Sequence, residues 1–380
     1  MHFEFTETQR SLRDEAREFA RETIEPRAME LDRREEHPTA ILEELGEMGY
    51  GGLVLPESVG GLGHGLPELA VVTEELSAAL MPVASALALH VGVAAVVDRF
   101  GSDDLRSRVL PEMARFETVG ALGLSEENAG SDKRRMETTA TRDGDEWVLD
   151  GHKRWITNFD HADVVLTYAK TGDDAAAPHN VSAFLVPTDA FEVETVWDTL
   201  GARTVKSPKA SLSGVRVPDA DRVGEVGEAY VERGDVNTGV NVPARGVGIA
   251  RACLEAAVAE TSEREQFGGP VADFQGVRWD VAEMAERVDA ARLLTYRAAA
   301  VAERTGEAAR ELSLAKVHAT QAAVDNANDA LQLHGGIGYT TERHVERHLR
   351  DARLLTIAGG PNEGHKDTVA DATYERYPLD

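Results

Sequence analysis

Residues 123–132 read Gly123-Leu124-Ser125-Glu126-Glu127-Asn128-Ala129-Gly130-Ser131-Asp132. This stretch combines two glycines, two serine hydroxyls and an amide side chain, which is typical of a loop whose backbone lies close to a flat or phosphorylated ligand. The same residue types also form ordinary helix-capping turns. A second stretch, Trp155-Ile156-Thr157-Asn158, follows one predicted strand and turn later and favours the ligand-binding interpretation.

The spacing of apolar residues changes on both sides of this loop. Upstream, a first helix is expected to start at a capping box formed by Thr6 and Gln9 and to run until Pro26. Further helices are expected over residues 38–48, 67–80, 85–99 and 105–116. From about residue 118, short β-branched and aromatic runs separated by Asp-Gly and Pro turns predict strands. Long alanine-rich helical patterns then return over 244–264, 274–304, 307–333 and 345–357.

This order predicts an α+β protein with three packed units, which a length of 380 residues can accommodate. We expect an N-terminal helical domain over residues 1–117 and a middle, barrel-like antiparallel β domain over residues 118–226. The four long patterns after residue 227 predict a C-terminal four-helix bundle over residues 227–380.

The chain is strongly acidic, with 67 acidic against 40 basic residues and a formal charge of −27. Acidity spread over the whole sequence favours a solvating surface and suggests a halophilic, salt-rich cytoplasm, while it disfavours nucleic acid and anionic membranes as partners. Cys253 is the only cysteine and lies in an apolar run, so we expect a buried thiol and a reducing compartment. The N-terminus shows no signal-peptide pattern, and the weakly polar run 85–97 is too short to span a bilayer.

Together, loop 123–132 and the Trp155–Asn158 stretch resemble the flavin-contacting motifs of the FAD-dependent acyl-CoA dehydrogenase family. The resemblance covers essentially the whole chain. It implies that Leu124 and Ser125 meet the pyrimidine edge of the flavin and that Thr157 hydrogen-bonds near N5, the atom that takes the hydride. It further implies a cofactor-binding role for Gly130, Ser131, Trp155 and Ile156, with Ser131 also at the substrate.

A second set of motifs resembles the family's pyrophosphate and adenosine segments. Arg264-Glu265-Gln266-Phe267-Gly268 is followed by Gln275, and Gln332-Leu333-His334-Gly335-Gly336 lies further on. The resemblance implies that Arg264 reaches the flavin pyrophosphate across a subunit interface, which suits its fork of donors. It therefore implies a homo-oligomer, usually a tetramer, with FAD contacts from Arg264, Phe267, Gln275, Gln332, Gly335 and Gly336.

The reaction implied by the resemblance is α,β-desaturation of an acyl-CoA in fatty acid metabolism, with electrons passed to an electron-transfer flavoprotein. In family members a glutamate removes the α proton, and its backbone amide helps to polarise the thioester carbonyl. Counting from Arg350-Asp351-Ala352 puts Gly359 at the position of this base, followed by the substrate-binding position Gly360. Thr238 occupies the alternative base position used by some relatives.

Three explanations for the missing glutamate stay open. A nearby acid, Asp235, Glu232 or Glu363, could serve as the base from a shifted position. The chain could instead be the base-less subunit of a hetero-oligomer, or a flavoprotein of altered chemistry, including an oxidase or a non-catalytic acyl-CoA or flavin binder. No metal site is expected, because His344 and His348 lack the partner cluster that a metal needs and are predicted to lie on a solvated helix face.

Overall fold

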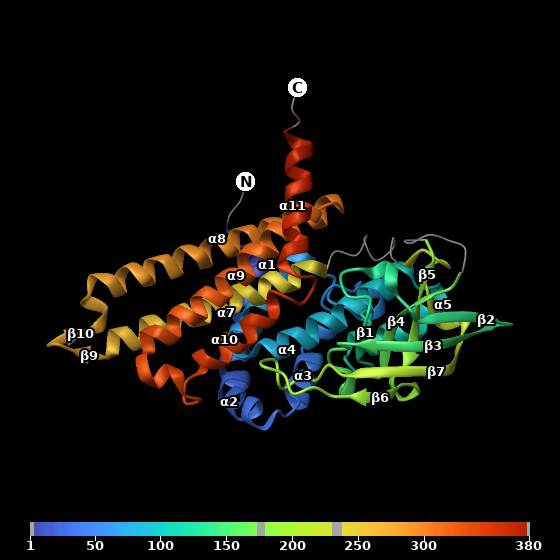
Figure 1. Ribbon diagram of the computed structural model, residues 1–380, viewed down its shortest axis with the longest axis horizontal. Coiled ribbons are helices and arrows are strands. Elements are labelled where there is room, and N and C mark those ends of the chain that lie inside the picture. The colour runs from blue at the N-terminus through green and yellow to red at the C-terminus, as the bar shows by residue number, and fades with distance from the viewer. Residues whose placement is uncertain (1–3, 173–178, 230–237, 378–380) are drawn as a thin grey trace.

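A computed structural model describes residues 4–172, 179–229 and 238–377 of the chain. Helices form one elongated side of the molecule, and a β domain forms the other side, as Figure 1 shows. This arrangement confirms the predicted fold class. The candidate bases Asp235 and Glu232 lie outside the described residues.

The N-terminal helices begin as the sequence predicts. α1 (Glu7–Phe19) starts at a capping box in which the Thr6 hydroxyl accepts from the Gln9 N–H at 3.2 Å and the Gln9 side chain accepts from the Thr6 N–H at 3.0 Å. The expected end at Pro26 is wrong: a π-helical turn, η1 (Ala20–Ile24), leads directly into α2 (Glu25–Arg34). Pro26 lies in the first turn of α2, where its missing N–H leaves no helical hydrogen bond unmade.

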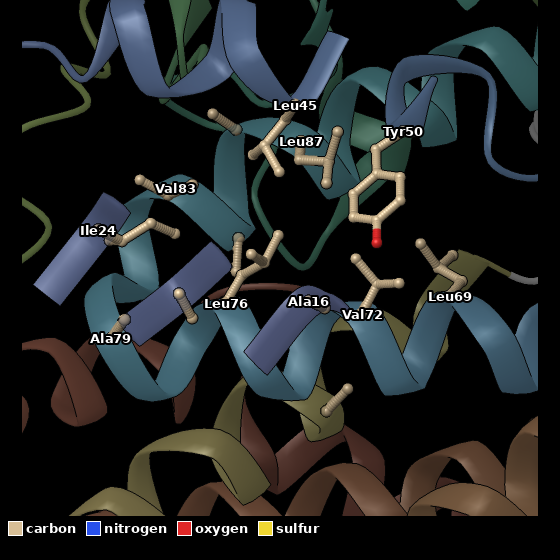
Figure 2. Close-up of a cluster of buried hydrophobic side chains, with 14 of the residues drawn as sticks. Ala16, Ile24, Leu45, Tyr50, Leu69, Val72, Leu76, Ala79, Val83 and Leu87 are labelled. Atoms are coloured by element: carbon tan, nitrogen blue, oxygen red, sulfur yellow. The ribbon is translucent and has the colours of Figure 1, made fainter. Parts of the chain in front are cut away.

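α4 (Leu66–Phe100) is the central helix of the protein. It joins the two helices predicted over 67–80 and 85–99, and a break in its helical backbone at Leu80, just before Pro82, marks their boundary. α4 is long and apolar enough to cross a membrane by composition, but most of its side chains are buried inside the protein. Figure 2 shows Leu69, Val72, Leu76, Val83 and Leu87 of this helix packed with α1, α3 (Thr39–Glu47) and Tyr50. α5 (Asp103–Ala114) completes the domain.

The middle domain is one eight-stranded sheet of order β6-β7-β3-β2-β4-β5-β8, with β1 paired to β4. The pairing is antiparallel except for β1 with β4 and a one-residue contact of β2 with β4, which are parallel. The strands are β1 (Gly120–Gly123), β2 (Thr139–Asp143), β3 (Glu146–Arg154), β4 (Val164–Lys170), β5 (Val181–Pro187), β6 (Glu192–Thr195), β7 (Lys209–Pro218) and β8 (Arg222–Val223). The loop 123–132 therefore starts where β1 ends.

The C-terminal domain packs α7 (Asn241–Glu263), α8 (Gln275–Thr305), α9 (Ala309–His334) and α10 (His344–Leu355) into the predicted bundle. A short hairpin of β9 (Glu265–Gln266) and β10 (Gly269–Pro270) joins α7 to α8. The sequence did not predict α11 (Asn362–Arg376), which stands away from the bundle in Figure 1. Two glycines let α7 approach its neighbours, because a Cβ on Gly246 would lie 2.7 Å from the Ala319 carbonyl oxygen and one on Gly248 would lie 2.3 Å from that of Glu74.

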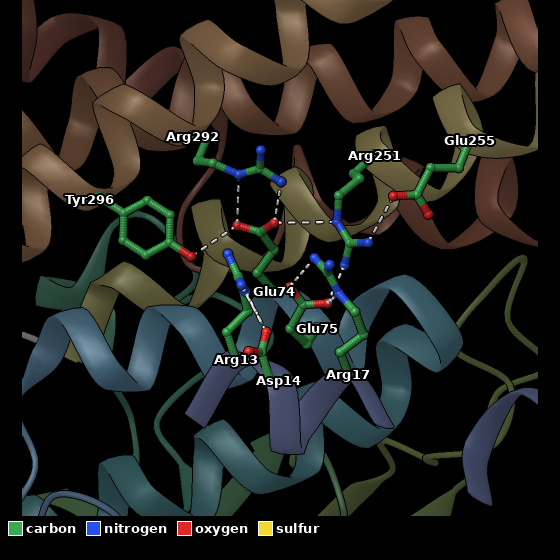
Figure 3. Close-up of polar contacts among 9 residues, drawn as sticks. All are labelled: Arg13, Asp14, Arg17, Glu74, Glu75, Arg251, Glu255, Arg292 and Tyr296. Carbon is green, nitrogen blue, oxygen red and sulfur yellow. Dashed lines mark hydrogen bonds and ion pairs between the residues drawn. The ribbon is translucent and has the colours of Figure 1, made fainter. Parts of the chain in front are cut away.

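Two adjacent carboxylates of α4, Glu74 and Glu75, are buried where the N-terminal and C-terminal helices meet (Figure 3). Arg292 pairs with Glu74 at 2.6 Å, and Arg251 pairs with Glu75 at 2.6 Å. Arg17 adds a second pair to Glu75 at 2.9 Å, and the Tyr296 hydroxyl donates to Glu74 at 2.9 Å. Burial by itself would raise the pKa of the Glu74 carboxyl, but the charges of Arg292 and Arg251 hold it below its usual value.

We predict that Arg251→Met lowers the free energy of unfolding by about 3 to 5 kcal/mol, because it leaves two buried carboxylates short of positive charge. Equilibrium denaturation in urea measures this difference. Arg34→Met is the matched control, since Arg34 pairs with Glu30 on the surface and its loss should cost at most about 1 kcal/mol. Equal losses in the two variants would contradict a central role for the buried network.

Candidate active site

Glu126 anchors the loop 123–132 to the sheet. Its buried carboxylate accepts hydrogen bonds from the N–H groups of Glu137 at 2.5 Å and Thr138 at 3.2 Å, and from the fully buried Lys153 ammonium at 2.5 Å. Burial by itself would raise the pKa of Glu126, but Lys153 and the backbone donors keep it below its usual value. The loop is therefore fixed at its centre, while Gly130 and Ser131 at its far end are exposed.

Trp155 presents its indole ring at the surface on a strained backbone. Its φ of +60° is rare for a bulky residue, and half of the side chain is exposed. The backbone N–H of Trp155 donates to the Pro208 carbonyl at 3.1 Å, and its ring stacks on Trp197 at 4.3 Å between centroids. Trp197 was not predicted from the sequence, because no motif marks it. It lies three residues before a turn formed by Leu200–Arg203.

Ser125 and Thr157 supply hydroxyl groups beside this ring. The Arg154 N–H donates to the Ser125 carbonyl at 2.8 Å, which joins the loop to the Trp155–Asn158 stretch. The Thr157 hydroxyl oxygen accepts from Ser207 at 3.1 Å, so its own proton is free to donate to a ligand acceptor. Among the described residues, the half-buried Ser125 hydroxyl makes no hydrogen bond.

The side chain of Ile156 is fully buried in the core of the β domain, where it fixes the segment that carries Trp155 and Thr157. Its predicted contact with the cofactor therefore stays a prediction for its backbone only.

The second set of predicted flavin contacts lies elsewhere in the same chain. Arg264 donates to the His334 carbonyl at 3.2 Å, next to Gly335, and Phe267 is 96% exposed at the tip of the β9–β10 hairpin. In Figure 1 this hairpin lies at the end of the bundle opposite to the β domain. One chain therefore does not bring Arg264, Phe267, Gln275, Gln332, Gly335 and Gly336 together with Leu124, Ser125, Trp155 and Thr157.

Gly359 and Gly360 form a turn between α10 and α11, and both have positive φ, at +69° and +95°. Side chains hold both carbonyl groups: His365 Nε2 lies 3.0 Å from the Gly359 oxygen, and Lys316 Nζ donates to the Gly360 oxygen at 2.6 Å. Lys316 is buried, which lowers its pKa to about 8, and Glu363 opposes this effect. Within the described part of the chain, neither glycine N–H donates a hydrogen bond.

Lys316 and His365 were not predicted from sequence. The available signal was a lysine within the alanine-rich run of α9, in a chain where arginine is the common base. A Cβ on Gly359 would lie 2.9 Å from Cγ2 of Val242 on α7, so a side chain at this position requires Val242 to move. Glu363 is exposed in the first turn of α11 and forms no ion pair with the described residues.

α10, which precedes the Gly359–Gly360 turn, also contacts the middle domain. The Asp351 carboxylate accepts from the Ala202 N–H at 2.7 Å, and a Cβ on Gly201 would lie 2.5 Å from the Arg350 carbonyl oxygen, so the Leu200–Arg203 turn packs directly on the helix.

The prediction that His344 and His348 lie on a solvated face is wrong for His348. This residue is only 3% exposed, and burial keeps its pKa well below the usual value.

These features suit a flavin. An exposed indole gives a flat wall, two hydroxyl groups and an anchored glycine-containing loop give donors, and exposed arginine and glycine backbone at the bundle end suit a diphosphate. The chemistry of these donors therefore fits FAD. The group around Trp155 suits its ring, and the group around Arg264 suits its diphosphate.

Comparison with known proteins agrees with this reading. The sequence matches the acyl-CoA dehydrogenase N-terminal domain over residues 6–117, the middle domain over 121–215 and the C-terminal domain over 237–374. It is 34% identical to the probable acyl-CoA dehydrogenase YngJ of Bacillus subtilis over 97% of this chain and 99% of that protein. The structure matches butyryl-CoA dehydrogenase from Megasphaera elsdenii with a TM-score of 0.94 and 30% identity, covering 98% of this chain and 100% of that one.

The chain thus belongs to the acyl-CoA dehydrogenase family of oxidoreductases, which act on the CH–CH bond of acyl-CoA. FAD is the cofactor of this family. A glutaryl-CoA dehydrogenase from Mycobacterium smegmatis in complex with FADH₂ matches with a TM-score of 0.91 and 25% identity, covering 99% of this chain and 97% of that one.

We predict that Lys153→Met destabilises the protein by about 3 to 5 kcal/mol at pH 7, because Glu126 is left as an unpaired buried carboxylate. Since the folded pKa of Glu126 lies below its unfolded pKa, the carboxylate's favourable contribution is complete above the unfolded pKa and is lost as the pH falls from there through the folded pKa. Urea denaturation of Lys153→Met and of Glu126→Gln/Lys153→Met measures the coupling. A double variant no more stable than Lys153→Met would contradict the unpaired-charge explanation.

Proposed function

We propose that this protein desaturates an acyl-CoA thioester between Cα and Cβ and passes the electrons to an electron-transfer flavoprotein. The family membership supports the reaction class, and the Gly359–Gly360 turn is the observation that carries the substrate assignment. Its two N–H groups have no partner among the described residues, while His365 and Lys316 hold both of its carbonyl groups. A thioester carbonyl placed at these amides would be polarised, which acidifies the adjacent Cα proton.

The resemblance to the family supports the roles of the remaining site residues in this proposal. Leu124, Ser125 and Thr157 would donate to the ring of FAD, Trp155 would cover it, Gly130 and Ser131 would contact the cofactor, and Ser131 and Gly360 would lie toward the substrate. FAD supplies the hydride acceptor for the hydrogen that leaves Cβ. Because residue 359 is a glycine, the Cα proton goes to a carboxylate elsewhere in this proposal. Glu363, Asp235 and Glu232 are the candidates.

We also propose that two copies of the chain build each FAD site. The β9–β10 hairpin lies at the end of the bundle away from the β domain that carries Leu124, Ser125, Trp155 and Thr157 (Figure 1), so Arg264, Phe267, Gln275, Gln332, Gly335 and Gly336 of one copy would complete the site of another. A homotetramer built from two such dimers satisfies this requirement, as does a hetero-oligomer with a related subunit that carries a glutamate at the position of Gly359.

The direct test mixes the FAD-loaded protein anaerobically with a panel of acyl-CoA thioesters and follows the visible flavin absorbance. We expect at least one thioester to bleach the flavin of the unmodified protein. An oxidised flavin with every thioester, despite bound FAD and bound acyl-CoA, would overturn the proposal and favour a partner subunit or a binding protein.

A variant pair separates the base from the scaffold. We predict that Gly359→Glu/Val242→Ala bleaches about 10²- to 10⁴-fold faster than the unmodified protein, because it places a carboxylate on the turn that would polarise the thioester, whereas the unmodified protein relies on an acid from outside this turn. Val242→Ala removes the methyl group that a side chain at this position would meet. Gly359→Ala/Val242→Ala is the matched control without a carboxylate. No gain over this control would mean that the unmodified protein already has an efficient base elsewhere.

A further inference from the structure

Two histidines face each other where the N-terminal helices meet the β domain. His37 follows α2, and His161 ends the 3₁₀ turn η5 (Phe159–His161) of the middle domain. Their rings stack in parallel with centroids 3.4 Å apart and planes 11° apart. No motif in the sequence brings these residues together, because they are 124 positions apart.

The stacked pair holds Asn158 by hydrogen bonds. His37 Nε2 lies 2.6 Å from the Asn158 side-chain oxygen, and His37 Nδ1 lies 2.9 Å from the Thr39 hydroxyl. The Thr39 hydroxyl is also 3.4 Å from Nδ1 of His161. A neutral His37 satisfies both of its contacts, since Nε2–H donates to the amide oxygen and Nδ1 accepts from the hydroxyl.

Asn158 directly follows Thr157 in the flavin-contacting segment. It is 1% exposed and has a φ of +68°, and its backbone N–H donates to the Lys206 carbonyl at 3.1 Å. The end of α2 adds a second link to this segment, because the Glu35 carboxylate pairs with the Lys206 ammonium. The orientation of Thr157 therefore depends on a contact between two domains.

The surroundings of His37 offer little compensation for positive charge, whereas His161 is exposed. The rings border a cavity of about 160 Å³ that is lined by Phe116 and Val119 and by one carboxylate, Glu43. Asp160, beside His161, is exposed, and Glu35 is already paired with Lys206. Among the described residues, no carboxylate forms an ion pair with either ring. Two imidazolium rings at stacking distance would repel each other.

We infer that the His37–His161 pair is a positioning device for the predicted flavin-contacting segment 155–158, that it works only while the His37 imidazole is neutral, and that acidification releases it. The inference rests on the proposed function for the contact between this segment and FAD. His37 and His161 act through Asn158 and do not themselves touch the reacting atoms.

The direction of the pH dependence follows from the burial of His37. Burial lowers its pKa from 6.5 to about 4, the hydrogen bond to Asn158 opposes this, and a protonated His161 would lower it further. Between pH 6.5 and about pH 4, His37 binds more protons in the unfolded chain than in the folded chain. The contact of the neutral His37 therefore stabilises the fold fully above pH 6.5, and this stabilisation is lost as the pH falls through about 4.

The experiment measures the dissociation constant of FAD and the visible circular dichroism of bound FAD from pH 7.5 down to about pH 4, the pKa of His37, at fixed ionic strength. We expect the unmodified protein to bind FAD at least about tenfold more weakly at the acidic end, with a changed dichroism band that reports the altered surroundings of the ring. His37→Gln keeps a donor for Asn158 without a titrating group, and His161→Phe keeps the stacking partner without a charge. Both should flatten the pH dependence while binding FAD normally at pH 7.5.

His179→Gln is the control, because His179 is an exposed histidine paired with Glu228 and its loss should leave the profile unchanged. FAD affinity of the unmodified protein that changes less than about twofold over this range, or the same profile in His37→Gln, would overturn the inference while leaving the proposed function intact. Absence of FAD binding at every pH would overturn both. If one histidine variant fails to fold, the other still decides the question.

Discussion

The structure depends on the neutralisation of two carboxylates that α4 carries into the centre of the protein. Glu74 and Glu75 are 2% and 3% exposed, and each would cost several kcal/mol in that position without a partner. Their partners come from α1, α7 and α8, three helices that are far apart in the sequence (Figure 3). Because the charges pair only when all four helices are in place, the network specifies how the N-terminal helices dock on the C-terminal bundle.

This docking places the parts of the candidate site. α7 packs closely against α4 and α9 through Gly246 and Gly248, and it presents Val242 to the turn that contains Gly359. α10 receives the Leu200–Arg203 turn of the middle domain through Asp351, so the sheet and the glycine turn share one support. The end of α2 binds both neighbours, since Asp32 pairs with Arg350 at 2.5 Å while His37 contacts Asn158 at 2.6 Å. The predicted flavin-contacting segment 155–158 and the Gly359–Gly360 turn are thus fixed relative to each other by the N-terminal domain.

Several features could be predicted from short stretches of sequence. The capping box of Thr6 and Gln9, the change from helical to alternating spacing near residue 118, and the long bundle helices all follow from local periodicity. α11 was missed because it carries no continuous apolar stripe and contacts the bundle only near its start. Pro26 was misjudged because proline ends a helix in its interior but is compatible with a first turn, and the π-helical turn before it cannot be read from residue types.

The sequence by itself determined the family, the cofactor and the order of the three structural units, because these depend on motifs and on spacing within a few residues. It also predicts that Gly359 stands at the position of the family's glutamate. Only the tertiary structure decided that Ile156 is a core residue, that Lys316 and His365 hold the glycine turn, and that the two groups of predicted flavin contacts lie apart in one chain. The physical reason is that burial, charge pairing and ring stacking depend on atoms from other segments of the chain, as the contact between His37 and His161, 124 positions apart, demonstrates.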